Sequence, residues 1–269
     1  MKLSLLFPAI AIAFISCSEK KRGETIVLTG SSTVAPLVAD AALRFESAHP
    51  GSRVEVQTGG SSRGIADALY GLATFGMISR ELKPDEAALT AHPIAVDGVG
   101  VIVHRGNAVS NFTRQDLINI YTGKISNWKT MGGKDAPITV ANKAEGRATL
   151  EVFLEYTGLD SADIVASVVV GENQQAIRTV VANPNAIAYV SIGSAASEAA
   201  AGTPVKLANC DGVEPTHENV AAGKFPIMRP LQLVTRGEIP VSAREFLDFL
   251  TAPANRDLIE AHLYVPLTK

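Results

Sequence analysis

Apolar and polar positions along the chain alternate between two periods. Short runs rich in β-branched residues, such as TIVLTG at 25–30 and SRVEVQTGG at 52–60, follow the period of strands. Between them, VAPLVADAALRFESAHPG at 34–51 places apolar residues every three to four positions, as an amphipathic helix does. Strands that alternate with helices at this spacing predict an α/β fold with mostly parallel sheets.

The same alternation continues to the end of the chain. Further strands are predicted at 74–79, at 136–142 and in the second half of 174–193. Further helices are predicted at 64–73, 112–125, 148–159, the first half of 174–193 and twice within 242–266. Two longer extended runs, near 94–104 and 226–236, are long enough to cross between lobes. We therefore expect a first lobe of residues 25–98 plus 232–269, a second lobe of 99–231, and two hinge segments between them.

The first seventeen residues, MKLSLLFPAIAIAFISC, form a separate segment. One lysine precedes an apolar run that is too short to span a bilayer, which is typical of a secretory signal peptide. Because a small residue and then a cysteine end the run, it resembles a bacterial lipobox in which Cys17 is lipidated. Residues 18–24 then read as a polar tether. We expect a periplasmic or cell-surface protein, lipid-anchored to a bacterial membrane, with Cys210 as its only thiol and no internal disulfide.

Composition removes several classes of function. The 269 residues are 46% hydrophobic, and the formal net charge is −3 without any basic block, which argues against a nucleic-acid partner. The two cysteines and five histidines show no metal-ligand spacing. We expect no metal and no cofactor.

Three loops of one kind follow predicted strands and precede predicted helices. They are Gly30-Ser31-Ser32-Thr33, Gly59-Gly60-Ser61-Ser62-Arg63-Gly64 and Lys143-Ala144-Glu145-Gly146-Arg147-Ala148-Thr149. Each hydroxyl can be an ordinary helix cap. Alternatively, the free N–H groups at each helix start, with glycines that allow close approach and hydroxyls that donate, can bind an anion. Three such loops together favour the anion site.

Basic residues near these loops support an anion site. They are Arg63, Arg80, Lys143 and Arg147. Arg147 points most strongly to an anion site, because a guanidinium forms two parallel hydrogen bonds to an oxyanion. A cation without a ligand is also unfavourable in the first turn of a helix, since that end of the helix is itself positive.

Over nearly its whole mature length, the chain resembles the phosphate-binding proteins of bacterial ABC-type phosphate transporters. The resemblance is carried by GSSTV at 30–34, GGSSRGI at 59–65, FGMISREL at 75–82, IYTGKISNW at 120–128, AIAYVSIG at 186–193, PLQLVTRG at 230–237, FLDFLTAP at 246–253 and YVPL at 264–267. It implies a two-lobed periplasmic-binding-protein fold of type II that closes about a hinge, with each lobe a mostly parallel sheet flanked by helices.

The resemblance also implies a function and its residues. The protein would bind inorganic phosphate or a similar tetrahedral oxyanion as a monomer, without catalysis, and deliver it to an ABC permease of the inner membrane. The ligand contacts carried over to this chain are Ser32, Thr33, the N–H of Val34, Ser61, Ser62, Ser79, Lys143, Arg147, the backbone of Ala148, and Thr149.

Two departures from the family pattern bear on which anion binds. Many members have an arginine and a Gly-Ser-Gly-Thr turn where this chain has Lys143 and Gly146-Arg147-Ala148-Thr149. Some members have an aspartate in place of Ser79. That carboxylate accepts the proton of hydrogen phosphate and repels sulfate, whereas a serine can accept or donate and discriminates less sharply.

Two other functions are compatible with the residues. Gly60-Ser61-Ser62-Arg63-Gly64 matches the G-x-S-x-G of a hydrolase, with Ser62 as nucleophile and His217 or His262 as base. The chain could also be a lipid-anchored sensor or binder of molybdate, tungstate, sulfate or an organic phosphate. In that case Trp128, Tyr121 and Phe153 could line a pocket for an organic group, although ordinary core packing at helical spacing explains them better.

Overall fold

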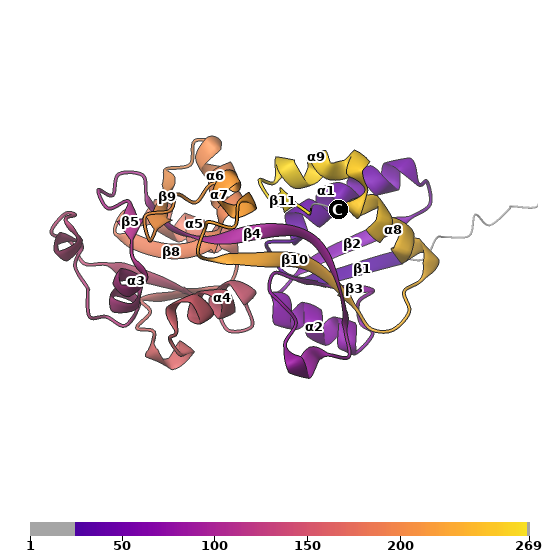
Figure 1. Cartoon of the computed structure of the whole chain (residues 1–269), viewed down its shortest axis with the longest axis horizontal. Coiled ribbons are helices and arrows are strands. Elements are labelled where there is room, and N and C mark those ends of the chain that lie inside the picture. Colours follow the sequence, from indigo (N-terminus) through magenta and orange to yellow (C-terminus); the bar gives the residue numbers. More distant parts are fainter. Residues whose placement is uncertain (1–24, 268–269) are drawn as a thin grey trace, which may run out of the picture.

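The computed structural model describes residues 25–267, and these residues form two α/β lobes connected by two long strands. The connecting strands are β4 (Thr90–His104) and β10 (Met228–Thr235), which pair with each other in antiparallel orientation (Figure 1). The expected lobe boundaries, 98/99 and 231/232, fall inside these two strands and remain a prediction. The predicted signal peptide, Cys17 and tether lie outside the described residues.

The first lobe is built around three parallel strands followed by the two connecting strands. The sheet has the order β2-β1-β3-β10-β4, with β1 (Thr25–Gly30), β2 (Arg53–Thr58) and β3 (Phe75–Ile78). Helices α1 (Ala35–Ala48) and α2 (Ser61–Leu69) connect the parallel strands, as parallel pairing requires. The chain later returns here with α8 (Val241–Thr251), α9 (Arg256–Ala261) and β11 (Val265–Pro266), which pairs with β4. A core containing Leu28, Phe45 and Phe246 joins both segments.

The second lobe continues from the far end of β4. There β4 pairs with β8 (Ala186–Ser191) and β9 (Val205–Cys210), and β8 continues the sheet through β6 (Thr139–Lys143) to β7 (Val168–Val170). A two-residue strand, β5 (Asn111–Phe112), pairs with β9. Its helices are α3 (Arg114–Tyr121), α4 (Ala148–Thr157), α5 (Asn173–Ala182), α6 (Ile192–Ala200) and α7 (His217–Ala221).

Aromatic side chains fill the core of the second lobe. Trp128, Tyr121 and Phe153 are at most 1% exposed, and the ring of Phe153 stacks on Tyr189 with 4.0 Å between centroids. All three aromatics therefore pack in the core, although Trp128 also borders a pocket with His104 and Asn185 that shares no residue with the hydroxyl-rich loops. In the same core, burial raises the pKa of the Cys210 thiol to about 12.

The predicted elements agree with the structure except where they are short or amphipathicity is weak. Helices α6 and α7 and strands β5, β7, β9 and β11 were not predicted. Helix α6 is alanine-rich, α7, β5, β7 and β11 have five residues or fewer, and β9 breaks the apolar–polar alternation at Leu207-Ala208. In β10 the pairing with β4 shifts register between Leu231 and Gln232, an irregularity that locally bends a strand. No helix within residues 25–267 is both long and apolar enough to cross a membrane.

Candidate anion-binding site

The loop after β1 needs a glycine and uses one serine to order its turn. Gly30 has a φ of +131°, and a Cβ there would lie 2.3 Å from the carbonyl oxygen of Met77. Ser31 Oγ accepts weak hydrogen bonds from the N–H groups of Thr33 (3.2 Å) and Val34 (3.4 Å). Ser31 is thus a local cap, although α1 itself begins only at Ala35. The cap interpretation of this loop therefore applies to Ser31, and the anion-site interpretation remains for its other hydroxyls.

The loop after β2 packs against the first one and against the second lobe. The N–H groups of Gly59 and Gly60 both donate to the carbonyl of Gly30. Gly60 has a φ of +96°, and a Cβ there would lie 2.7 Å from the carbonyl oxygen of Gly146. Side chains larger than hydrogen are excluded, so the two lobes approach closely at this point.

The loop after β6 brings Arg147 to the same place. Arg147 directly precedes α4, and its Nη1 lies 2.6 Å from Glu172 Oε1. A Cβ on Gly60 would fall 2.9 Å from Arg147 Cδ, and one on Gly171 would fall 3.0 Å from Nη2. These two glycines therefore leave room for the guanidinium.

A narrow pocket forms where these loops meet, with a cavity volume of about 10 Å³. Its lining consists of Ser31, Ser32, Thr33, Gly60, Ser61, Ser79, Arg147, Ala148, Thr149 and Gly171. Seven predicted ligand residues are in this set: Ser32, Thr33, Ser61, Ser79, Arg147, Ala148 and Thr149. Among residues 25–267, no group of three or more His, Cys, Asp or Glu side chains could hold a metal ion.

Three predicted ligand residues do not line the pocket. Val34 is fully buried, and its N–H donates to Ser31 Oγ. Ser62 is exposed, and its N–H donates to the carbonyl oxygen of Gly146. Lys143 is 3% exposed, and its Nζ donates to Asn173 Oδ1 at 3.3 Å. A role of these three in ligand binding remains a prediction.

The two other basic residues near the loops are occupied elsewhere. Arg63 lies on an exposed surface with Asp67, Gln57 and the carbonyl of Thr58. Arg80 is buried in ion pairs with Glu86 and Glu151. Neither Arg63 nor Arg80 lines the pocket, so these two residues do not support the predicted anion site.

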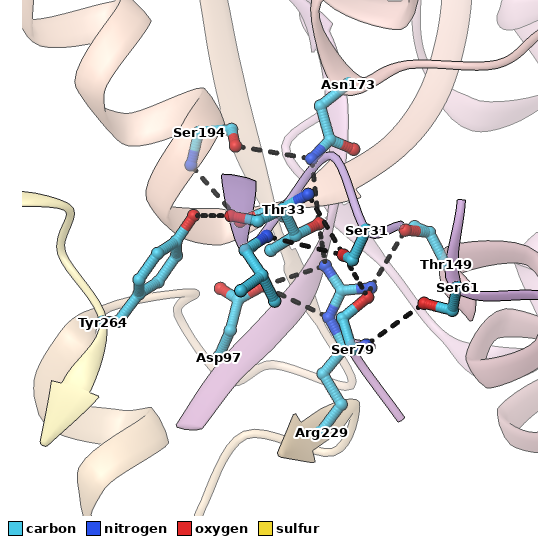
Figure 2. Close-up of polar contacts among 12 residues, drawn as sticks. Ser31, Thr33, Ser61, Ser79, Asp97, Thr149, Asn173, Ser194, Arg229 and Tyr264 are labelled. Carbon is cyan, nitrogen blue, oxygen red and sulfur yellow. Dashed lines mark hydrogen bonds and ion pairs between the residues drawn. The ribbon is translucent and has the colours of Figure 1, made fainter. Parts of the chain in front are cut away.

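A buried ion pair that sequence reasoning missed lies behind the pocket (Figure 2). Arg229 on β10 faces Asp97 on β4 in register, with Nη2 2.9 Å from Asp97 Oδ2, and both side chains are 1% exposed. Burial raises the pKa of Asp97, and the adjacent guanidinium of Arg229 opposes that rise. The available signal was that Asp97 is the single acidic residue of the first extended run and Arg229 lies inside the second, so the two runs carry opposite charges.

Arg229 orients the pocket hydroxyls. Its Nη2 donates to Thr33 Oγ1 (3.0 Å), and its Nη1 donates to Thr149 Oγ1 (2.9 Å) and Ser79 Oγ (3.3 Å). A guanidinium can only donate, so each of these oxygens accepts.

Other groups use the remaining acceptor capacity of two of these hydroxyls, those of Thr33 and Ser79. Thr33 Oγ1 also accepts from Asn173 Nδ2 (3.1 Å), and Ser79 Oγ also accepts from Ser31 Oγ (3.0 Å). Ser61 Oγ accepts from the N–H of Ser79. The hydroxyls of Thr33, Ser79, Thr149 and Ser61 are therefore left with hydrogens to donate, which suits a ligand rich in oxygen acceptors.

The hydrolase alternative requires a hydrogen bond between Ser62 and a histidine. Within residues 25–267 no hydrogen bond joins Ser62 to a histidine, and the His262 ring pairs with Asp40 instead. Since a nucleophilic serine needs a base within hydrogen-bond reach, the geometry does not support Ser62 in that role.

We predict that Arg229→Met lowers the free energy of unfolding by about 3–5 kcal/mol, because it leaves Asp97 buried without a partner. Urea denaturation monitored by circular dichroism measures this change. Arg44→Met is the matched control, since Arg44 pairs with Asp257 at 42% and 61% exposure and its loss should cost far less. Equal costs at the two positions would contradict the argument.

We also predict a pH dependence from Lys143. Burial lowers the pKa of Lys143 to about 7, Arg229 and Arg147 add to this effect, and Glu172 opposes it. The folded state therefore binds fewer protons than the unfolded state between pH 7 and the ordinary value of 10.5. Stability rises with pH in that window. Relative to Lys143→Met, the wild-type free energy of unfolding should increase by about 2 kcal/mol from pH 7 to pH 9. A difference that is independent of pH would show that the ammonium remains solvated.

Comparisons with known proteins agree with this geometry. Residues 17–254 match the family model described as "PBP superfamily domain". The phosphate-binding protein PstS of Bacillus subtilis is 31% identical over 255 residues, 93% of this chain and 83% of that protein. PstS of Borreliella burgdorferi is 25% identical and covers 95% of each chain.

Solved structures show the same relationship. A candidate phosphate ABC transporter substrate-binding protein from Clostridium perfringens, crystallised with bound phosphate, superposes with a TM-score of 0.86 at 32% identity, over 91% of this chain and all of that one. An ABC-type phosphate transport receptor from Vibrio cholerae gives 0.73 at 30% identity, over 90% of this chain and all of that one. The chain belongs to the PBP superfamily and, within it, to the family of PstS phosphate-binding proteins.

Proposed function

We propose that this chain binds inorganic phosphate between its lobes and delivers it to an ABC importer. The observation that carries the proposal is the set of pocket hydroxyls that accept from protein donors, twice at Thr33 and Ser79 and once at Thr149 and Ser61. These hydroxyls each keep a hydrogen to donate, and those of Thr33 and Ser79 can only donate. Together with the guanidinium of Arg147 and the start of α4, they match an oxyanion with several acceptor oxygens. Relatives named for phosphate binding support this choice.

The proposed cycle requires no chemistry on the ligand. The anion enters between separated lobes, and closure about β4 and β10 removes water and strengthens every polar contact. The permease would then recognise the closed form. We further propose that the protein acts as a monomer, held at the outer face of a bacterial membrane by lipid on Cys17.

A second ligand class is favoured by one contact. Ser79 Oγ already accepts from Arg229 and from Ser31, so it has no acceptor capacity left for the proton of hydrogen phosphate. Fully ionised sulfate, molybdate or tungstate is therefore not penalised at this position. A binder or sensor of one of these anions is the alternative function.

A thermal-shift series separates the two ligand classes. Phosphate at about 100 times its dissociation constant should add about 2.7 kcal/mol of stability, which raises the melting temperature by several degrees. Sulfate, molybdate, tungstate and a phosphonate are tested beside it at equal ionic strength. A shift with sulfate or tungstate but not with phosphate would reject the proposed ligand.

We predict that Arg147→Ala weakens phosphate binding by about 10- to 100-fold, because it removes a charged donor from the pocket. Arg63→Ala should change the affinity by less than about twofold, since its exposed ion pair lies outside the pocket. Isothermal titration calorimetry measures both variants. If both changes are negligible, the ligand does not bind in this pocket.

A further inference from the structure

Four charged side chains form a cluster that joins the two lobes beside the pocket. Arg80, Lys83 and Glu86 follow β3 in the first lobe, and Glu151 lies in the first turn of α4 in the second. Glu151 Oε2 is 3.0 Å from Arg80 Nε and 2.5 Å from Lys83 Nζ. None of the four lines the pocket, yet Arg80 is adjacent to Ser79 and Glu151 is two residues from Thr149. The cluster therefore connects two elements that each carry part of the anion site.

The first-lobe side of this cluster is ordered by contacts within its own lobe. Glu86 accepts two hydrogen bonds of 2.7 Å from Arg80 Nη1 and Nη2, and Gln232 Nε2 donates to the Arg80 carbonyl. The side chain of Arg80 is only 6% exposed. Its desolvation is thus already compensated by Glu86, and contact with Glu151 adds attraction at a lower desolvation cost than a newly buried pair would have.

Among the four side chains of this cluster, cations and carboxylates are equal in number only when both lobes contribute. The first lobe supplies two cations, Arg80 and Lys83, against the one carboxylate of Glu86. Glu151 supplies the second carboxylate from the other lobe. Separation of the lobes would leave the Glu151 carboxylate without either cation, and Arg80 and Lys83 without this carboxylate.

We propose that Glu151 is a positioning residue whose pairing with Arg80 and Lys83 holds the lobes closed and thereby raises anion affinity without touching the anion. This inference rests on the proposed function. A ligand that contacts both lobes binds only those molecules whose two half-sites are together. Its apparent affinity is therefore reduced in proportion to the fraction of such molecules. Loss of the pair lowers that fraction.

The sign of the effect distinguishes this role from direct electrostatics. Glu151 is a negative charge near an anion pocket, so direct repulsion alone predicts tighter anion binding when the charge is removed. The closing role predicts weaker binding. The two explanations cannot give the same result.

Glu151→Gln tests the proposal, with Glu155→Gln as the matched control, because Glu155 is an exposed carboxylate one turn further along α4. Titration with inorganic phosphate should give about 5- to 30-fold weaker binding for Glu151→Gln and near wild-type binding for Glu155→Gln. Stopped-flow measurements should assign the loss mainly to faster dissociation. The melting temperature of the ligand-free protein should change little, since the pair joins the lobes and does not stabilise either core.

A double-mutant cycle with Lys83→Met provides the second measurement. Once Glu151 is neutralised, Lys83→Met should have little further effect on affinity, so the two losses should be strongly non-additive. Unchanged or tighter binding by Glu151→Gln, or additive losses in the cycle, would overturn the proposal. Failure of the wild-type protein to bind phosphate would instead reject the proposed ligand, and the variants would then be compared with whichever anion raises the wild-type melting temperature. If no anion does so, the inference falls with the proposed function.

Discussion

The structure depends on one buried ion pair between its two connecting strands. Arg229 and Asp97 face each other in register at the point where the lobes meet, and both are removed from water. Such a pair gains little over an apolar contact, but it is costly to break because either charge alone would be stranded. Its value here lies in the donors that remain: three guanidinium hydrogen bonds reach hydroxyls from both lobes. The pair thus couples the hinge to the pocket.

The chemistry of the pocket follows from this arrangement. A serine or threonine hydroxyl is ambivalent in isolation, since it can donate or accept. Arg229, Asn173 and Ser31 supply donors to these oxygens and so determine where the hydrogens point. Hydroxyls that would discriminate poorly by themselves become a set of donors with a defined polarity. Protein groups that contact the pocket hydroxyls therefore determine what charge the pocket accepts.

Much of the fold could be predicted from the sequence, because its strands and longer helices have clear periods of two and 3.6 residues. The two connecting strands were recognisable by their length, and the three hydroxyl-rich loops by their position between strand and helix. Seven of the ten predicted ligand residues lie together at one pocket. The family resemblance was needed to choose among anion site, cap and hydrolase.

The rest could not be predicted because it depends on contacts between distant segments. Arg229 and Asp97 are 132 residues apart, and only strand pairing reveals that they are partners. Arg80 appeared to be a free cation near a loop, yet Glu86 and Glu151 neutralise it. Ser62 and Ser61 are neighbours in one helical turn, so their opposite exposures depend on how α2 packs. Local pattern identifies donors, whereas tertiary packing decides which of them are available.

The paired connection between the lobes has a consequence for how the site assembles. Two hydrogen-bonded strands form a ribbon, and a ribbon bends and twists far more easily than it stretches or shears. The register irregularity at Leu231 and Gln232 is a natural place for that bending. The two half-sites consequently stay tethered at a high effective concentration, so the second half engages a captured anion as an intramolecular step. Mutations that stiffen or loosen this ribbon would therefore alter the rate of capture without changing a single ligand contact.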